Sequence, residues 1–341
     1  MRRVAVIGAG KRVVKTALPA LQRAASSFTI DAVYARSERD LEVEGVTYAV
    51  RPLAGNEERA LAAVDLVYLA VGKDAVPKVL ARLLEHDVAR LDLLIDTPVV
   101  RFKHFRHATS IRSFRNAWVA EDCAYLPWLD TVRAACGEAG PLGALQHVRF
   151  DRSAYAYHGL ATAKTLFASD AVVRARRKRV DASRAQRELA LAGGGQATIV
   201  EPRDYAAGHL VFEGARGMAT DRADRGSAHA FEPILVAGEC RGFRIGDVET
   251  QLDAHEVELA RGDPPSAGVT ARMEAMKRVG FLRLLRAIDA GRGAYALDAG
   301  LDDMVVDYWL EKLGFWLATP LTSPRAALGR WLLATASRAG K

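Results

Sequence analysis

Hydrophobic positions in the first third of the chain alternate between short apolar runs and stretches with helical spacing. Apolar runs without polar interruption are typical of strands that are buried on both faces. The predicted strands are 3–8, 28–36, 46–50, 65–71 and 91–96, and the predicted helices between them are 12–25, 55–63 and 74–86. Pro19 lies inside the first helix and predicts a kink or an early break there. This alternation predicts an α/β fold with an open, doubly wound parallel sheet that has helices on both faces.

The pattern changes after about residue 120. A helix is predicted over 125–139, and strand-like runs then follow one another with Gly, Asp and Pro between them, which indicates an antiparallel sheet. These runs are 144–152, 170–180, 186–191, 196–201, 208–213, 231–237 and 241–247. Helical spacing returns at 268–290, 302–317 and 324–338, and Trp309 and Trp316 would share one face of the second of these helices. We therefore expect two domains: 1–122, and an α+β domain with C-terminal helices over 123–341.

Composition excludes several classes of protein. The chain has 341 residues, enough for two cores, and no apolar stretch reaches the ~20 residues that span a bilayer. The N-terminus continues directly into a glycine turn without a secretory cleavage site, so we expect a cytoplasmic protein. The three cysteines (Cys123, Cys136 and Cys240) are widely spaced, which argues against disulfides and a zinc site. The net charge of +7 comes from basic residues interspersed with acidic ones, so we expect no nucleic-acid partner.

A glycine turn follows the first strand. Gly8 permits a tight turn, and Gly10 allows a pyrophosphate to approach the backbone where the next helix begins. Val13 occupies the place of the third glycine of the usual G-x-G-x-x-G motif. In this strand–turn–helix context the motif predicts a dinucleotide-binding domain of the Rossmann type. The alternative is a glycine turn that binds nothing.

The end of the second strand favours NADP over NAD. NAD-binding domains usually carry an acidic residue here that accepts a hydrogen bond from the ribose 2′-hydroxyl, but the corresponding residue is Ala35. Arg36 and Ser37 follow it and suit a 2′-phosphate, with Arg39 within a turn. Ordinary solvated loop arginines are the alternative.

Several segments carry a resemblance to a known family. They are Val4-Ala5-Val6-Ile7-Gly8-Ala9-Gly10-Lys11-Arg12, Leu18-Pro19-Ala20-Leu21, Val64-Asp65-Leu66-Val67-Tyr68-Leu69-Ala70-Val71, Leu94-Ile95-Asp96-Thr97-Pro98, Val119-Ala120-Glu121, Tyr125-Leu126-Pro127 and Leu142-Gly143-Ala144-Leu145. In these segments, over residues 1–150, the chain resembles the Gfo/Idh/MocA family of oxidoreductases, which includes glucose–fructose oxidoreductase and inositol dehydrogenase. The resemblance implies an N-terminal Rossmann domain and a C-terminal domain with an open antiparallel sheet. One face of that sheet holds the substrate, and the other often forms a dimer.

The resemblance and the motifs together predict the cofactor site. Its expected residues are Gly8, Gly10, Lys11, Arg12, Arg36, Ser37, Arg39, Ala70, Val71, Asp96, Thr97 and Pro98. Asp-Thr-Pro stands where the family has Glu-Lys-Pro, so the family's lysine, which contacts nicotinamide and substrate, is replaced by Thr97. A hydroxyl at that position can still hold nicotinamide or substrate through a hydrogen bond.

Another residue must then supply the proton that accompanies hydride transfer. His158 is the first candidate, because it lies near the start of the segment where the family keeps a pocket-facing histidine and because imidazole titrates near neutral pH. Tyr157 and Thr97 are the other candidates for catalysis. Glu121, Tyr125 and Tyr155 are expected to contact the substrate. For His158 the alternative is a structural histidine, and Lys164 is expected to be solvated.

Two basic clusters could in principle bind a metal ion or an anionic ligand. His104 and His107 have the spacing of a metal pair, but basic residues surround them and no carboxylate or cysteine completes a set, so we expect no metal. The run Arg174–Arg179 is expected to be a solvated strand, with an interface or anionic ligand as the alternative.

We expect an NADP-dependent oxidoreductase that exchanges a hydride with a small polar substrate at a carbonyl/alcohol or imine/amine centre, in a biosynthetic or carbohydrate-related pathway. We also expect a homodimer or higher homo-oligomer. The runner-up is a catalytically inactive dinucleotide-binding relative with a scaffolding or regulatory role, favoured by Thr97. An imine reductase of the siderophore-pathway kind, which also departs from Glu-Lys-Pro, is a third possibility.

Overall fold

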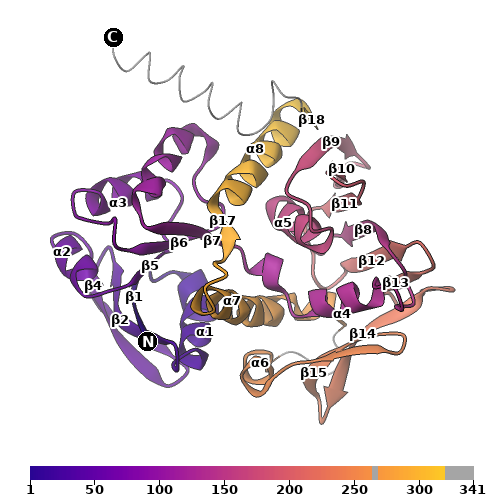
Figure 1. Cartoon of the computed structure of the whole chain (residues 1–341), viewed down its shortest axis with the longest axis horizontal. Helices are drawn as coiled ribbons and strands as arrows, with labels where there is room; N and C mark the ends of the chain where they lie inside the picture. The colour runs from indigo at the N-terminus through magenta and orange to yellow at the C-terminus, as the bar shows by residue number, and fades with distance from the viewer. Residues whose placement is uncertain (263–267, 319–341) are drawn as a thin grey trace. The chain divides into compact units, whose positions relative to one another are not determined.

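The computed structural model describes residues 1–262 and 268–318, and the chain divides into two compact units (Figure 1). Unit 1 comprises Met1–Asp122 and Phe281–Met304, and unit 2 comprises Cys123–Gly280 and the chain from Val305 on. The long helices α7 (Met273–Asp289) and α8 (Leu297–Leu313) therefore contribute residues to both units. Within the described residues no helix is both long and apolar enough to cross a bilayer.

Unit 1 is built on an eight-stranded sheet in the order β17-β7-β6-β5-β1-β2-β4-β3. Its strands are β1 (Arg2–Ile7), β2 (Phe28–Ala35), β3 (Arg39–Val43), β4 (Val46–Pro52), β5 (Leu66–Leu69), β6 (Asp92–Asp96), β7 (Asn116–Ala120) and β17 (Tyr295–Ala296). The six strands from β7 to β4 are parallel and have the Rossmann order. The doubly wound sheet predicted from the apolar runs is confirmed.

Both edges of this sheet are antiparallel, which the alternating pattern did not predict. At one edge β3 and β4 form a hairpin whose turn residues, Glu44 and Gly45, both have positive φ angles of 50° and 79°. A two-residue turn of this kind matches the twist of the flanking strands. At the other edge β17 brings a late segment of the chain beside β7.

Helices flank the strands of unit 1: the π-helical turn η1 (Val13–Ala17), α1 (Leu18–Arg23), α2 (Glu57–Ala62), α3 (Val76–Leu83), and the 3₁₀ segments η2 (Phe102–Ala108) and η3 (Ser110–Ser113). Pro19 accounts for the irregular start of the first helix. Proline has no N–H to donate to the residue four positions earlier, and its ring crowds that carbonyl. The wider π turn just before α1 is one way to accommodate the ring, in agreement with the kink predicted at this site.

Unit 2 is built on a ten-stranded sheet in the order β16-β15-β14-β13-β12-β8-β11-β10-β9-β18. Its strands are β8 (Leu145–Asp151), β9 (Val172–Arg179), β10 (Ala185–Leu191), β11 (Gln196–Glu201), β12 (His209–Gly214), β13 (Met218–Thr220), β14 (His229–Val236), β15 (Glu239–Ile245), β16 (Val248–Gln251) and β18 (Phe315–Leu317). Its helical segments are η4 (Asp122–Tyr125), which begins at the last residue of unit 1, α4 (Trp128–Ala135), α5 (Ala156–Leu166), α6 (Ala254–Leu259) and η5 (Thr270–Arg272). The pairs β8/β11 and β13/β14 are parallel and the other pairs are antiparallel. The predicted open sheet is therefore confirmed, with mixed strand directions.

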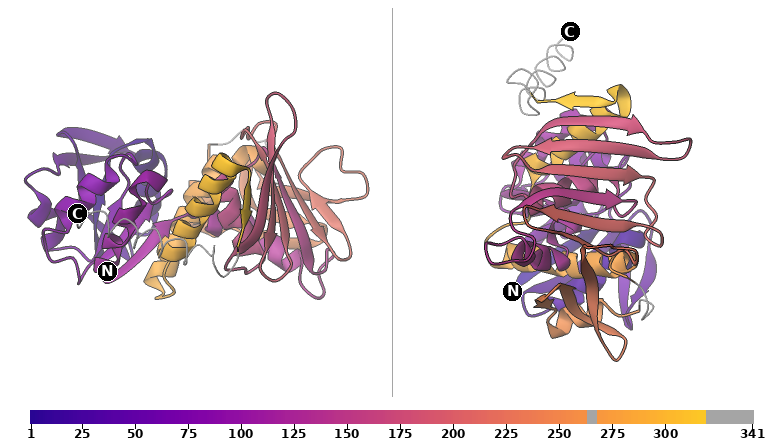
Figure 2. Two further views of the ribbon diagram at one scale, coloured as in Figure 1. Left: turned by 90° about the horizontal axis from the view of Figure 1, so that it is seen from above. Right: turned by 90° about the vertical axis from the view of Figure 1, so that its right-hand side faces the viewer.

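The strands of unit 2 lie side by side as one broad layer, with α5 and the C-terminal part of α8 on the same face (Figure 2). A buried guanidinium fixes α8 to this face. Arg187 of β10 is 2% exposed and binds Glu201 at 2.8 Å, Asp307 at 2.6 Å and the carboxylate of Glu311. Two of its three acidic partners come from α8, so one arginine joins the sheet to the helix.

Two expectations for the chain after residue 122 need correction, and a third falls outside the described residues. Trp316 does not share a helical face with Trp309, because α8 ends at Leu313 and Trp316 belongs to β18, which pairs with β9. Lys164 was expected to be solvated but is 4% exposed on α5. The helix expected over 324–338 lies outside the described residues.

The expected properties of the basic run and of the cysteines agree with the structure. Arg174–Arg179 lies in β9, and most of its side chains are exposed. Cys123, Cys136 and Cys240 are not joined in disulfides, and Cys123 and Cys240 are buried.

We predict that Arg187→Met lowers the free energy of unfolding by about 3 kcal/mol, because it leaves three acidic side chains without their shared cation. Equilibrium urea unfolding measures the change. Arg184→Met is the control, since its pair with Asp181 is exposed and should leave the midpoint unchanged. Equal midpoints for Arg187→Met and the wild type would show that the ion pairs do not hold α8 to the sheet.

Candidate functional site

The glycine turn of unit 1 is closed on one side and open on the other. Gly8 has a φ angle of +132°, and a β-carbon there would lie 2.1 Å from the carbonyl oxygen of Ala70, so only glycine fits. A β-carbon on Gly10 would meet no atom within 4 Å, and Gly10 and Lys11 are exposed. The turn therefore packs tightly where β1 ends beside β5 and leaves the backbone at the start of the first helix accessible to a ligand.

The end of β2 offers accessible cations beside this turn. Ala35 is the last residue of β2, and Arg36, Ser37 and Arg39 are all exposed. The Arg39 guanidinium donates a hydrogen bond of 2.8 Å to the carbonyl oxygen of Ala9. Arg39, one of the side chains predicted near a 2′-phosphate, is thus in contact with the glycine turn, and no carboxylate occupies position 35.

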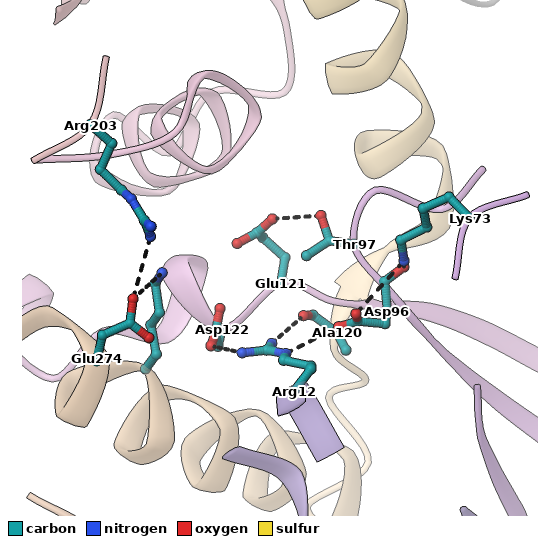
Figure 3. Close-up of polar contacts among 10 residues, drawn as sticks. Arg12, Lys73, Asp96, Thr97, Ala120, Glu121, Asp122, Arg203 and Glu274 are labelled. Carbon is teal, nitrogen blue, oxygen red and sulfur yellow. Dashed lines mark hydrogen bonds and ion pairs between the residues drawn. The ribbon is translucent and has the colours of Figure 1, made fainter. Parts of the chain in front are cut away.

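Arg12, expected to bind the cofactor, is engaged by acidic residues of its own unit (Figure 3). Its guanidinium binds Asp122 at 2.6 Å and Asp96 at 3.1 Å, and it donates to the carbonyl oxygen of Ala120 at 3.2 Å. Burial by itself lowers the pKa of Arg12, but the charges of Asp122 and Asp96 outweigh it and raise the pKa well above its usual value. Arg12 stays charged and joins the start of the first helix to the ends of β6 and β7.

The segment after β6 carries a second hydrogen bond of the candidate site. The Thr97 hydroxyl donates to Glu121, which follows β7, at 3.1 Å (Figure 3). Glu121 is 2% exposed, whereas Asp96, Thr97 and Pro98 are half-buried. Two residues predicted independently, one for catalysis and one for substrate, are therefore in contact. Ala70 and Val71, also half-buried, follow the neighbouring strand β5.

Sequence reasoning missed Lys73, which follows β5. Its ammonium donates to the carbonyl oxygen of Asp96 at 2.8 Å and lies 3.7 Å from the carboxylate of the same residue (Figure 3). Burial lowers the pKa of Lys73, the charge of Arg12 lowers it further, and the charge of Asp96 opposes both. A lone lysine after an apolar strand gives no sequence signal, since its partner lies 23 residues away.

The aromatic candidates lie together in unit 2, at the start of α5. The rings of Tyr157 and His158 have centroids 4.4 Å apart, and Tyr155 stacks on Tyr157 at 6.3 Å with an interplanar angle of 6°. Tyr155 is exposed and Tyr157 half-buried, whereas His158 is buried at 8% exposure. Tyr125, at the end of η4, is half-buried.

A second cluster in unit 2 was not predicted. The Arg203 guanidinium lies over the ring of Tyr155 at 3.9 Å and over that of Tyr205 at 4.5 Å, and it binds Glu274 at 3.3 Å (Figure 3). Lys277 lies 5.1 Å from the Tyr205 ring centroid. Cation–aromatic contacts of this kind hold a guanidinium in one orientation. The contacts of Arg203 with Tyr155 and of Lys277 with Tyr205 join residues far apart in the sequence, which no local pattern reveals.

The two histidines with metal-like spacing are placed on η2, with ring centroids 6.2 Å apart. His104 lies 3.6 Å from Asp74, which also binds Arg101 at 2.9 Å and Lys103 at 3.0 Å. The Asp74 carboxylate is thus shared among several cations, which disfavours a divalent metal at this pair.

Comparison with known proteins identifies the fold. No family model and no curated protein matches the sequence. Among solved structures, a myo-inositol dehydrogenase from Corynebacterium glutamicum has a TM-score of 0.62 and 14% identity over 94% of this chain and 99% of its own. A structure described as a putative myo-inositol dehydrogenase from Sinorhizobium meliloti has a TM-score of 0.60 and 16% identity over 94% and 100%.

A third solved structure is that of scyllo-inositol dehydrogenase from Lactobacillus casei with bound NAD(H) and scyllo-inositol. It has a TM-score of 0.58 and 11% identity over 93% of this chain and 98% of its own. Likeness at this level of identity establishes a shared fold. The two-domain fold that the sequence resemblance implied is confirmed.

We predict opposite outcomes for the two glycines of the turn. Gly8→Ala should destabilise the protein by about 2 kcal/mol or more, because the new methyl group meets a backbone carbonyl and the φ angle suits only glycine. Gly10→Ala should unfold at the wild-type temperature, since its methyl group meets no protein atom. Thermal unfolding monitored by circular dichroism measures both, and similar losses for the two variants would contradict the assigned geometry.

Proposed function

We propose that this chain is an NADP-dependent oxidoreductase that exchanges a hydride with a small polar substrate, at a carbonyl/alcohol or imine/amine centre. The observation that carries the proposal is the glycine turn, closed against Ala70 and open at Gly10, with exposed Arg36 and Arg39 beside it. The fold agrees with this function, since the compared structures are described as dehydrogenases and one of them contains NAD(H).

The residues of unit 1 fit a dinucleotide. In a sheet with this strand order the ligand lies across the carboxyl ends of the strands, with its pyrophosphate at the first glycine turn. Gly8, Gly10 and Lys11 would hold the pyrophosphate, and Arg36 and Ser37 would hold the 2′-phosphate. The segments after β5 and β6, which include Val71 and Thr97, would hold the nicotinamide half. NADPH, when bound, supplies the hydride.

The chemistry required of the protein is then to orient the substrate and deliver a proton. We propose that His158 delivers the proton, with Tyr157 beside it, and that Glu121, Tyr125 and Tyr155 contact the substrate. Thr97, whose hydroxyl donates to Glu121, holds substrate or nicotinamide rather than transferring a proton. A threonine hydroxyl is too weak an acid for that step near neutral pH.

The same site also suits a second function. A relative that binds NADP(H) and regulates or scaffolds a pathway without turnover would need the glycine turn but no lysine at position 97. Thr97 is the observation that favours it. The test is to measure NADPH oxidation in the presence of a panel of ketones and imines. If NADPH binds but no member of the panel is reduced, the second function is established and the first is refuted.

We also propose that unit 2 pairs with a second copy through the face of its sheet that α5 and α8 leave open. A broad sheet face is most simply covered by symmetric pairing. Sedimentation at micromolar concentration tests the proposal, and a monomer would refute it.

We predict that NADPH binds at least tenfold more tightly than NADH, a difference of about 1.4 kcal/mol, because Arg36 and Ser37 can hold the additional phosphate. Titration of intrinsic fluorescence with each cofactor measures the two dissociation constants. Arg36→Ala should remove the preference, whereas Arg59→Ala, in α2, should keep it. Equal affinities in the wild type, or an undiminished preference in Arg36→Ala, would refute the NADP assignment.

We predict that His158→Ala lowers kcat by about 10²–10⁴-fold with little change in NADPH affinity, the effect typical of removing a general acid. Thr97→Val should instead raise KM modestly. The exposed His255, on α6, provides the control, and His255→Ala should keep full activity. Full kcat in His158→Ala would transfer the role of proton donor to Tyr155, Tyr157 or Glu121.

A further inference from the structure

Lys73 brings an ammonium group to the position where the chain lacks a lysine. It follows β5, and its side chain reaches across to the end of β6, where it donates to the carbonyl oxygen of Asp96 at 2.8 Å (Figure 3). That carbonyl belongs to the peptide that joins Asp96 to Thr97. The ammonium nitrogen is therefore held beside residue 97 by a neighbouring strand of the same sheet.

Lys73 is not the nearest cation to the Asp96 carboxylate. The Asp96 carboxylate already has a closer cation, since Arg12 binds it at 3.1 Å and Lys73 lies 3.7 Å away. The Lys73 ammonium donates to the Asp96 carbonyl at 2.8 Å and also interacts with the carboxylate of the same residue at 3.7 Å. An ammonium has three N–H donors, so at least one remains for a ligand after these two contacts.

The groups that face Lys73 have opposing effects on its pKa. Burial lowers its pKa, and the cation Arg12 from the start of the first helix lowers it too, whereas Asp96 from β6 raises it. A partly desolvated cation interacts more strongly with a nearby negative charge than a solvated one. Lys73 is thus suited to stabilise negative charge that develops close to Thr97.

We propose that Lys73 donates a hydrogen bond to the reacting oxygen or nitrogen of the substrate and stabilises the negative charge that forms there during reduction. This inference rests on the proposed oxidoreductase function. In the reduction of a carbonyl, a hydride from NADPH bonds to the carbon, and the π-electron pair moves to the oxygen. That oxygen takes a proton from the donor, which leaves the alcohol and NADP⁺. Lys73 ends the reaction unchanged.

The position of the group is compatible with this role. In a sheet of this strand order, the segments after β5 and β6 border the nicotinamide half of a dinucleotide. A positioned donor that stabilises an oxyanion commonly contributes about 10²–10³-fold to kcat. We therefore expect Lys73→Met to lower kcat by about that factor while the dissociation constant of NADPH stays within about threefold.

An exchange of residues tests the proposal most directly. If the ammonium is required and either strand end can present it, Lys73→Thr should have a lower kcat than the wild type. The double variant Lys73→Thr/Thr97→Lys should then have a kcat at least about tenfold higher than that of Lys73→Thr. The exposed Lys78 on α3 gives the matched control, and Lys78→Met should keep wild-type kcat. Circular dichroism of each variant verifies its folding, and Lys73→Arg keeps the charge if Lys73→Met fails to fold.

A measurement without turnover complements the kinetics. Lysine amines labelled by ¹³C-dimethylation give one NMR signal each, and the signal of Lys73 is the one missing from Lys73→Arg. We expect saturating NADP⁺ to shift this signal and the pH at which it titrates, and to leave the signal of Lys78 in place.

The outcomes separate this inference from the function on which it rests. The role of Lys73 would be overturned by any of three results: an unchanged kcat in Lys73→Met, no recovery in the double variant, or a Lys73 signal that NADP⁺ does not shift. Turnover by the wild type would still support the oxidoreductase function. A wild-type protein that binds neither NADPH nor NADP⁺ would refute both.

Discussion

One guanidinium joins three parts of unit 1: the start of the first helix, the end of β6 and the segment at the end of β7. Arg12 is bound by Asp96 and Asp122 and donates to the Ala120 carbonyl. Asp122 is fully buried, so the pair is stable only because both charges are present and hydrogen-bonded. The glycine turn, Thr97 and Glu121 all adjoin these anchor points, and the candidate site is therefore arranged around a cation that itself need not touch a ligand.

This arrangement also determines the charge available to a ligand. Arg12 is held by Asp96 and Asp122, so the charges that face a ligand come from other cations of unit 1. Arg36 and Arg39 lie exposed at the end of β2, and Lys73 lies partly buried at the end of β5. The first pair suits a phosphate group in water, whereas the partly desolvated ammonium suits a charge that appears only during a reaction.

The sequence predicted what depends on local periodicity and failed where a feature depends on distant partners. Apolar runs were sufficient for the parallel sheet, and the glycine turn was placed correctly because its geometry requires specific residues. The strand β3 was missed because Arg39–Val43 is largely polar, and β17 and β18 were missed because strands of two or three residues have no period. The bonds of Arg12 to Asp96 and Asp122 were not foreseen, since these partners lie 84 and 110 residues away in the sequence. Lys73 and Arg203 escaped notice for the same reason.

The exchange of a lysine between strand ends is physically simple in a parallel sheet. Adjacent strands lie about 4.8 Å apart, and all their carboxyl ends open at one edge. A lysine side chain with four methylene groups spans that distance, so the same point in space is accessible from the segment after β5 or from the segment after β6. The hydrogen bond from Lys73 to the Asp96 carbonyl is an instance of such a crossing. The ammonium group beside Thr97 is therefore supplied in this chain by a residue that follows the neighbouring strand.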